Sequence, residues 1–236
     1  VTGEDLLNMK ADKVPYLWEP FWKRYSLIGL AGSSDIGKSS FLRQLAISIV
    51  LKEESFLGHS LNVEHGRVIY FSTEDSKYTI NEILKKQHSN LDPSRLKDLC
   101  YIFNADDPLK VIEEQLNAAP TDLVIIDCFL DVFNGVINDA GSVRRYLDHF
   151  SRMAEKYKCT FIFLTHNGKR TEVNGPNKNN IIGSQAFEAK MRTVMELRKT
   201  DDGKRQLYFT KGNSLPDHLK KKCLELEFDD HQQFTF

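Results

Sequence analysis

Residues 32–40 read GSSDIGKSS, a stretch whose glycines and lysine have the spacing of a phosphate-binding loop. Glycines let successive backbone N–H groups converge on phosphate oxygens, and a helix beginning near Lys38 adds the positive end of its dipole. We expect Lys38 to reach the outer phosphates of a nucleotide and the Ser39 hydroxyl to bind Mg²⁺. The alternative is a glycine-rich turn with a solvated lysine. The predicted nucleotide-binding residues are Gly32, Ser33, Ser34, Asp35, Ile36, Gly37, Lys38, Ser39 and Ser40.

An aspartate ends the strongest buried-strand pattern of the chain, TDLVIIDCF at residues 121–129. In a sheet of parallel strands, ligands bind at the carboxyl ends of the strands. A lone carboxylate at such a place is costly unless it is paired or binds a metal. We expect Asp127 to bind Mg²⁺ together with Ser39, through a bridging water. The alternative is that Asp127 caps a following turn.

Two more strand-like runs end in side chains that can act on a phosphate. Glu74 ends RVIYFSTE and can orient and deprotonate an attacking water, a role that requires geometry rather than metal contact. Asp75 is adjacent, and the sequence separates the two weakly. His166 ends CTFIFLTH and can contact the γ-phosphate. Capping or surface roles for Glu74 and an ordinary packed His166 are the alternatives.

These side chains must be held by elements that alternate along the chain. Short apolar runs indicate buried strands, and apolar residues at helical spacing indicate helices between them. Such alternation predicts one α/β domain with a mostly parallel sheet covered on both faces. An Asp-Asp-Gly turn predicts a C-terminal antiparallel hairpin, with a last strand in KKCLELEF. The expected strands are 25–32, 66–75, 99–104, 121–129 and 159–166, and the expected helices are 38–53, 79–87, 108–119 and 140–157.

Composition narrows the class of protein. The 236 residues suit one domain, 1–236, in which residues 1–24 pack on the core, with Trp18 and Trp22 as packing residues. A formal net charge of -1 excludes a global basic field for nucleic acid or membrane. No run approaches the ~20 apolar residues that span a bilayer. The scattered cysteines Cys100, Cys128, Cys159 and Cys223 indicate reduced thiols in a cytoplasmic protein. The first residue, Val1, indicates an excised fragment.

Taken together, these residues resemble the RecA-like ATPases, and within them the RepA-like hexameric replicative helicases of the AAA_25 type. The resemblance covers nearly the whole chain. It rests on GLAGSSDIGKSSF, GRVIYFSTEDS and the long segment from DLVIIDCF to LTHNGK, and it continues in IIGSQAFEAKMRTVMEL and FTKGN. It implies a RecA-like fold, ATP and Mg²⁺ as ligands, and self-association into a ring of about six copies.

The resemblance also implies roles for individual residues. The hydrolytic glutamate of the family falls on Glu74, and its Walker B aspartate falls on Asp127. The arginine that serves the neighbouring subunit's nucleotide matches Arg192, and a lysine that also reaches across the interface matches Lys211. The chain departs from the family where Lys211 is followed by Gly212-Asn213 rather than x-Arg, and where Gly183-Ser184 is followed by Gln185. Arg192 as an ordinary surface residue is the alternative.

Three functions are compatible with the sequence. The first is a DNA-dependent ATPase, a helicase or loader in the replication or mobilisation of a plasmid or mobile element, with single-stranded DNA and other replication or mobilisation proteins as partners. Its best DNA-binding segment is 167–180, with Lys169, Arg170 and Lys178; residues 133–141 are the second. The second function is a nucleotide-gated regulatory or assembly switch that moves no strand. The third, a small-molecule kinase, lacks an arginine-rich lid.

Overall fold

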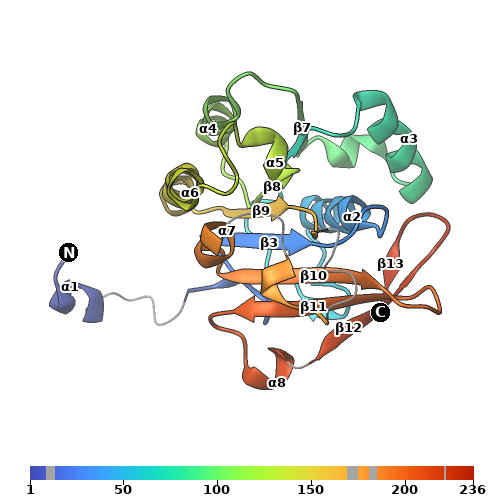
Figure 1. Ribbon diagram of the computed structural model, residues 1–236. Coiled ribbons are helices and arrows are strands. Elements are labelled where there is room, and N and C mark those ends of the chain that lie inside the picture. The colour runs from blue at the N-terminus through green and yellow to red at the C-terminus, as the bar shows by residue number, and fades with distance from the viewer. Residues whose placement is uncertain (9–13, 169–174, 181–184, 221) are drawn as a thin grey trace.

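A mixed sheet forms the centre of the protein in the computed structural model, which describes residues 1–8, 14–168, 175–180, 185–220 and 222–236. Its strand order is β13-β12-β11-β10-β3-β9-β8-β6-β7 (Figure 1). The parallel strands are β3 (Leu27–Ala31), β6 (Val68–Ser72), β7 (Leu99–Phe103), β8 (Leu123–Asp127), β9 (Thr160–Leu164) and β10 (Thr193–Lys199). The antiparallel extension consists of β11 (Arg205–Gly212), β12 (Cys223–Phe228) and β13 (Phe234–Thr235).

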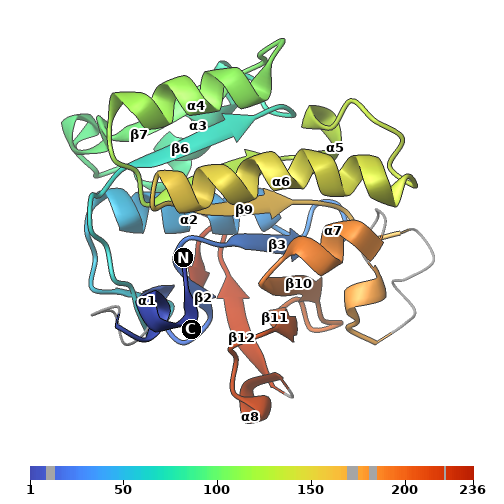
Figure 2. The same ribbon diagram turned by 90° about the vertical axis from the view of Figure 1, so that its left-hand side faces the viewer.

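Helices cover both faces of this sheet. One face carries α2 (Lys38–Val50) and α3 (Lys77–Gln87). The other carries α4 (Pro108–Ala118), the short α5 (Phe129–Val132), α6 (Ala140–Lys156) and α7 (Gln185–Lys190), with α4, α6 and α7 turned towards the viewer in Figure 2. The remaining elements are α1 (Gly3–Leu7), α8 (Asp217–Lys220), the 3₁₀ turns η1 (Pro93–Leu96) and η2 (Lys178–Asn180), and two small hairpins, β1 (Tyr16–Trp18) with β2 (Trp22–Lys23) and β4 (Ser55–Phe56) with β5 (His59–Ser60).

Burial on both faces explains the apolar runs of the parallel strands. In β8, Leu123 and Ile125 face the core under α2, whereas Val124 and Ile126 face the core under α4 and α6. Successive side chains of a strand point to opposite faces, so a strand buried on both sides must be apolar throughout. Polar groups are therefore confined to the strand ends.

The helices follow from amphipathic spacing and local capping. In α6, Val143, Leu147, Phe150 and Ala154 are completely buried and recur at helical spacing. The Asp139 side chain caps the helix by accepting a hydrogen bond from the Gly141 N–H at 2.9 Å. This stripe buries α6 against the sheet.

The sequence-based prediction of an α/β fold with a mostly parallel sheet and a C-terminal antiparallel extension is confirmed. One detail of the prediction is wrong: β12 is not the edge of the sheet, because β13 pairs with its end at Phe228↔Phe234. The Gln44 side chain of α2 fixes β13 by donating to the Phe234 carbonyl at 2.9 Å and accepting from the Phe234 N–H at 2.8 Å. That long-range contact leaves no periodic signal in the sequence.

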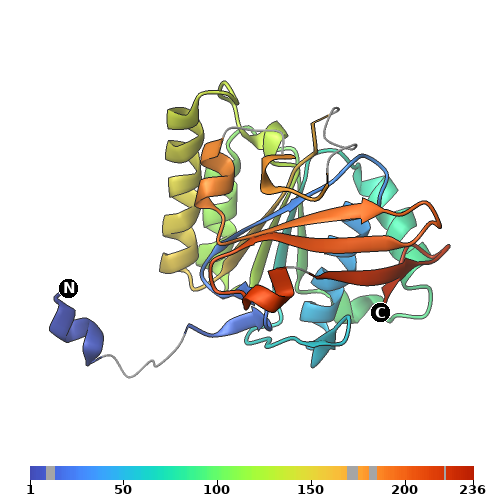
Figure 3. The same cartoon turned by 60° about the horizontal axis from the view of Figure 1, so that its bottom comes forward.

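The N-terminal region has two parts with different packing. Trp18 and Trp22 are completely buried, in agreement with their predicted packing role. By contrast, α1 has no buried residue and projects away from the body of the protein (Figure 3). Among the described residues, no helix combines the length and apolar character needed to cross a membrane.

A buried ion pair joins the N-terminal region to the sheet. Arg24 is 1% exposed, and its Nη2 lies 2.8 Å from Oδ1 of the completely buried Asp122. The Asp122 carboxylate also accepts backbone N–H groups of Glu64, His65 and Gly66 at 3.1, 2.9 and 2.6 Å. The carboxylate thus organises the turn that leads into β6.

We predict that Asp122→Ala lowers the free energy of unfolding by about 3–5 kcal/mol, because it leaves the Arg24 charge buried without its partner. Urea denaturation followed by circular dichroism measures this change. Glu64→Gln is the control, since Glu64 lies 3.3 Å from Arg24 Nε but is 45% exposed, and it should cost less than about 1 kcal/mol. Equal effects of the two substitutions would contradict the argument.

Candidate active site

The predicted phosphate loop lies between β3 and α2, at the carboxyl edge of the sheet. Gly37 occupies the N-cap of α2 with a φ of 98°, and a Cβ there would lie 3.0 Å from the Phe234 ring. A Cβ on Gly32 would lie 2.4 Å from Cδ1 of Ile36 and 2.6 Å from the Leu197 carbonyl oxygen. Both positions therefore require glycine. No side chain caps the helix, so its first N–H groups can receive an anion.

The Lys38 ammonium lies inside this loop. The residue is 5% exposed, and Nζ donates to the Ser33 carbonyl oxygen at 2.5 Å. Burial lowers the pKa of Lys38, while the nearby carboxylates of Asp127 and Glu74 counteract that shift. Phosphate oxygens can replace the Ser33 carbonyl as the acceptor, so the structure places this cation where the motif requires it.

Asp127 is 3% exposed and lies at the end of β8, behind the loop. Tyr70 donates its hydroxyl to Asp127 Oδ2 at 2.7 Å, whereas Oδ1 is buried and has no hydrogen-bond partner in the described part of the chain. Burial raises the pKa of Asp127, and hydrogen bonds from Tyr70 and Ser39 lower it in part. A buried carboxylate oxygen without a partner, beside a serine hydroxyl, fits a Mg²⁺ ion held by Ser39 and Asp127.

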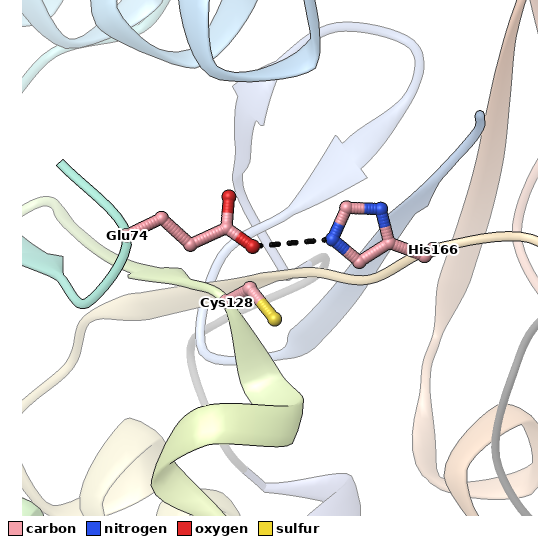
Figure 4. A group of neighbouring side chains, drawn as sticks. All are labelled: Glu74, Cys128 and His166. Carbon is pink, nitrogen blue, oxygen red and sulfur yellow. Dashed lines mark hydrogen bonds and ion pairs between the residues drawn. The ribbon is translucent and has the colours of Figure 1, made fainter. Parts of the chain in front are cut away.

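Glu74 and Asp75 have separate environments, which the sequence left unresolved. The Asp75 carboxylate lies 3.3 Å from Nη1 of Arg43, a residue of α2 that is 3% exposed. Glu74 Oε1 lies 3.2 Å from Nε2 of His166, and these two side chains point towards each other (Figure 4). Geometry therefore favours Glu74 over Asp75 as the carboxylate that faces a nucleotide.

The register of the sheet brings these groups together. The strands β3, β9, β8 and β6 are adjacent and parallel, with Leu30 opposite Leu164 and Ser72 opposite Asp127. The phosphate loop, His166, Asp127 and Glu74 follow the ends of these four strands. Parallel strands end at the same edge, so residues far apart in the sequence converge on one site.

Three side chains that support this site were not predicted. Tyr70 orients Asp127, and the Thr73 hydroxyl accepts the Cys128 N–H at 2.9 Å. Cys128 itself lies beside Glu74 and His166, and burial raises the pKa of its thiol to about 12. The only signal for Tyr70 was a hydroxyl within a run of otherwise apolar residues, because a buried tyrosine hydroxyl usually has a partner.

A buried acid, Glu196, also escaped the sequence analysis. It is 1% exposed in β10, opposite Ala31, and accepts hydrogen bonds from Asn167 Nδ2 at 2.9 Å and from the Asn177 N–H at 3.0 Å. Arg198 Nε donates to the same carboxylate at 2.7 Å. Glu196 therefore joins both ends of the 167–180 segment to the strand beside the phosphate loop. An acid inside the apolar run TVMEL was the available signal.

The residues predicted to bind DNA are only partly described. Lys169 and Arg170 lie outside the described residues. Lys178 is described: its Nζ lies 3.5 Å from Glu188 Oε1, and the side chain is 48% exposed. Lys178 is thus paired within its own chain, on a side chain that still reaches solvent.

Arg192 and Lys211 lie at the opposite edge of the sheet from the phosphate loop. Arg192 immediately precedes β10, and its N–H donates to the Leu27 carbonyl at the start of β3. Lys211 lies opposite Val194, and its Nζ is 3.0 Å from Glu188 Oε1. A groove of about 840 Å³ opens on this edge, with basic side chains in its lining: Lys23, Arg24, Arg144, Lys158, Lys190 and Arg192. Neither predicted finger lies at the nucleotide site of its own chain.

Comparisons with known proteins agree with this geometry. A family model described as an AAA domain, AAA_25, matches residues 2–172, a range that contains the phosphate loop, Glu74, Asp127 and His166 but ends before Arg192 and Lys211. Among 505 matching chains of solved structures, the ATPase domain of a replicative helicase has a TM-score of 0.71 at 12% identity, and the match covers 98% of this chain and 95% of that chain. At that identity the likeness shows the fold, which is RecA-like. No curated protein matches the sequence.

We predict that Tyr70→Phe moves the acidic limb of the pH profile of nucleotide hydrolysis to higher pH. The hydrogen bond from Tyr70 lowers the pKa of Asp127, so its loss raises that pKa, and the carboxylate becomes ionised only at a higher pH. Tyr101→Phe is the matched control. The ring of Tyr101 lies 5.1 Å from that of Tyr70, and its buried hydroxyl has no hydrogen-bond partner within the described ranges. Equal profiles for both variants would remove Tyr70 from the site.

Proposed function

Because the chain belongs to the AAA_25 family of AAA domains, we propose that it is a Mg²⁺-dependent ATPase that acts as a ring of about six subunits on single-stranded DNA. The observation that carries the proposal is the convergence of Lys38, Asp127, Glu74 and His166 at the ends of adjacent parallel strands. A helicase or loader in the replication or mobilisation of a plasmid or mobile element is the biological role that fits such an activity, in the cytoplasm and with other replication proteins.

Each residue of the site has a distinct part in the proposed reaction. The loop N–H groups and Lys38 bind the phosphates and neutralise charge that develops on them. Ser39 and Asp127 would hold Mg²⁺, which supplies electrophilic stabilisation of the phosphate oxygens. Glu74 orients and deprotonates the attacking water. His166, 3.2 Å from Glu74, links the base to the γ-phosphate position.

Assembly follows from the separation of the two edges. The phosphate loop lies at the carboxyl edge of the sheet, and Arg192 and Lys211 lie at the opposite edge. A head-to-tail contact between copies would bring the basic edge of one subunit to the nucleotide of the next, and such contacts close into rings. Arg192 would then act as an arginine finger in trans, with Lys211 beside it.

The 167–180 segment is the proposed DNA-binding element. Its basic residues are Lys169, Arg170 and Lys178, and Glu196 joins its base to the strand beside the phosphate loop. Repetition of a modest positive charge around a ring axis attracts the backbone of a single strand without sequence preference.

A second candidate is a nucleotide-gated assembly switch that does not translocate DNA. The observation that favours it is the position of Glu188, which pairs with both Lys178 and Lys211 in one chain. Subunit contact could exchange these pairs without any strand being moved. The response of hydrolysis to single-stranded DNA separates the two candidates.

We predict that Glu74→Gln and Arg192→Ala are each inactive alone but complement each other when mixed. Loss of the base costs about 10²–10⁴-fold in turnover, and loss of an arginine finger costs about 10³-fold or more. In a mixed ring, the intact site of an Arg192→Ala subunit meets the intact Arg192 of a Glu74→Gln subunit. Steady-state phosphate release from the mixture should therefore exceed the sum of the two separate activities.

The control for this mixture is Arg152→Ala, which removes an exposed arginine of α6 and should leave hydrolysis unchanged. Nucleotide binding by each variant, measured with a fluorescent ATP analogue, should match that of the original chain. A mixture no more active than its components would show that the finger does not act in trans.

We predict that replacing Lys169, Arg170 and Lys178 together by alanine abolishes stimulation by single-stranded DNA and preserves DNA-independent hydrolysis. Three lost phosphate contacts should make the slope of log affinity against log salt shallower by about 2, as measured by fluorescence anisotropy. Lys220→Ala with Lys222→Ala removes basic charge near β12 and is the control. Unchanged DNA affinity in the triple variant would favour the switch.

A further inference from the structure

Glu74, Cys128 and His166 form a cluster whose ligand atoms all lie within 4.8 Å of one another. They follow the ends of three adjacent strands, β6, β8 and β9, with Cys128 on the central one. Figure 4 shows the Glu74 carboxylate and the His166 ring meeting across the site, with the Cys128 side chain beside their hydrogen bond. Cys128 is 2% exposed, whereas Glu74 is 47% and His166 26% exposed. The cluster thus has a buried thiol as its floor and a polar pair that is open to solvent.

The three ligand types differ from those of the proposed Mg²⁺ site. Ser39 and Asp127 offer only oxygen, which suits a hard cation. A set of one nitrogen, one sulfur and one carboxylate oxygen suits zinc, which is bound at about 2.0–2.3 Å by such atoms. Ligand atoms at these lengths in a tetrahedron lie ~3.3–3.8 Å apart. The Glu74–His166 distance of 3.2 Å already agrees, and rotation of the Cys128 side chain can close the remainder.

We propose that Glu74, Cys128 and His166 bind a Zn²⁺ ion, with water as the fourth ligand, and that this ion inhibits ATP hydrolysis. On binding, the Cys128 thiol releases its proton to solvent, and the Glu74–His166 hydrogen bond is replaced by two bonds to the metal. The carboxylate that would activate water is then occupied. Removal of the ion restores the thiol and the hydrogen bond, so the inhibition is reversible.

The metal site is tested first without any measurement of hydrolysis. Co²⁺, a spectroscopic substitute for Zn²⁺, is added to the full chain without an affinity tag or nucleotide. We expect visible bands of a tetrahedral ion and a near-ultraviolet thiolate-to-cobalt band, both displaced by Zn²⁺. Cys128→Ser should lose the thiolate band and bind Zn²⁺ at least about 10-fold more weakly. Cys223→Ser, the control, should keep both properties.

Two further outcomes decide the proposal. A thiolate band that survives in Cys128→Ser, or the absence of any band in the original chain, would overturn the site. If the serine variant melts at a lower temperature than the original chain, Cys128→Ala and His166→Gln replace it in the same titration. Weakened Zn²⁺ binding in both would support the site, and unchanged binding in either would contradict it.

Inhibition is tested separately, and this step rests on the proposed ATPase activity. Zn²⁺ titrated at constant Mg²⁺ and ATP should stop phosphate release, and a zinc-selective chelator should restore it. With each rate divided by that protein's own zinc-free rate, Cys128→Ser should require at least about 10-fold more Zn²⁺ for half-inhibition than the original chain. Equal sensitivity of the two proteins would overturn the inhibitory role. A cobalt spectrum with no hydrolysis in the original chain would instead refute the proposed function and leave the metal site intact.

Discussion

A carboxylate buried at the edge of a doubly covered sheet is the constraint on which the site depends. Asp127 is 3% exposed, yet one of its oxygens has no hydrogen-bond partner in the described residues. Desolvation of a charge is costly unless a partner compensates it. Tyr70 compensates in part through the second oxygen, and the positive charges of Lys38 and Arg43 lie near enough to interact with the carboxylate. A bound cation is the compensation that this arrangement leaves open.

The same sheet separates two functional edges. Its carboxyl edge gathers the phosphate loop and the polar strand ends, and its opposite edge gathers Arg192, Lys211 and a basic groove. A parallel sheet has this polarity by construction, because every strand enters at one edge and leaves at the other. One chain therefore presents complementary surfaces facing in different directions. This polarity is the physical basis for the proposed head-to-tail assembly.

Short polar connections tie the site to its surroundings. Glu196 binds Asn167, which follows His166, and also the far end of the 167–180 segment at Asn177. Arg205 of β11 donates to the Ile36 carbonyl at 2.9 Å and so supports the phosphate loop from the antiparallel extension. Such buried polar contacts are specific in geometry, since an unpaired member would be costly. They connect the nucleotide position to both the proposed DNA-binding segment and the C-terminal strands.

The sequence by itself determined the strands, the helices and the phosphate loop, because each depends on a local pattern. Apolar runs specify strands buried on both faces, and Gly37 is required by a backbone angle within the loop itself. Only the tertiary structure decided which polar side chains meet. It paired Asp75 with Arg43 and Glu74 with His166, brought Tyr70 to Asp127, and attached β13 to α2. These contacts join residues far apart in the chain, and strand register, which no single segment encodes, sets their distances.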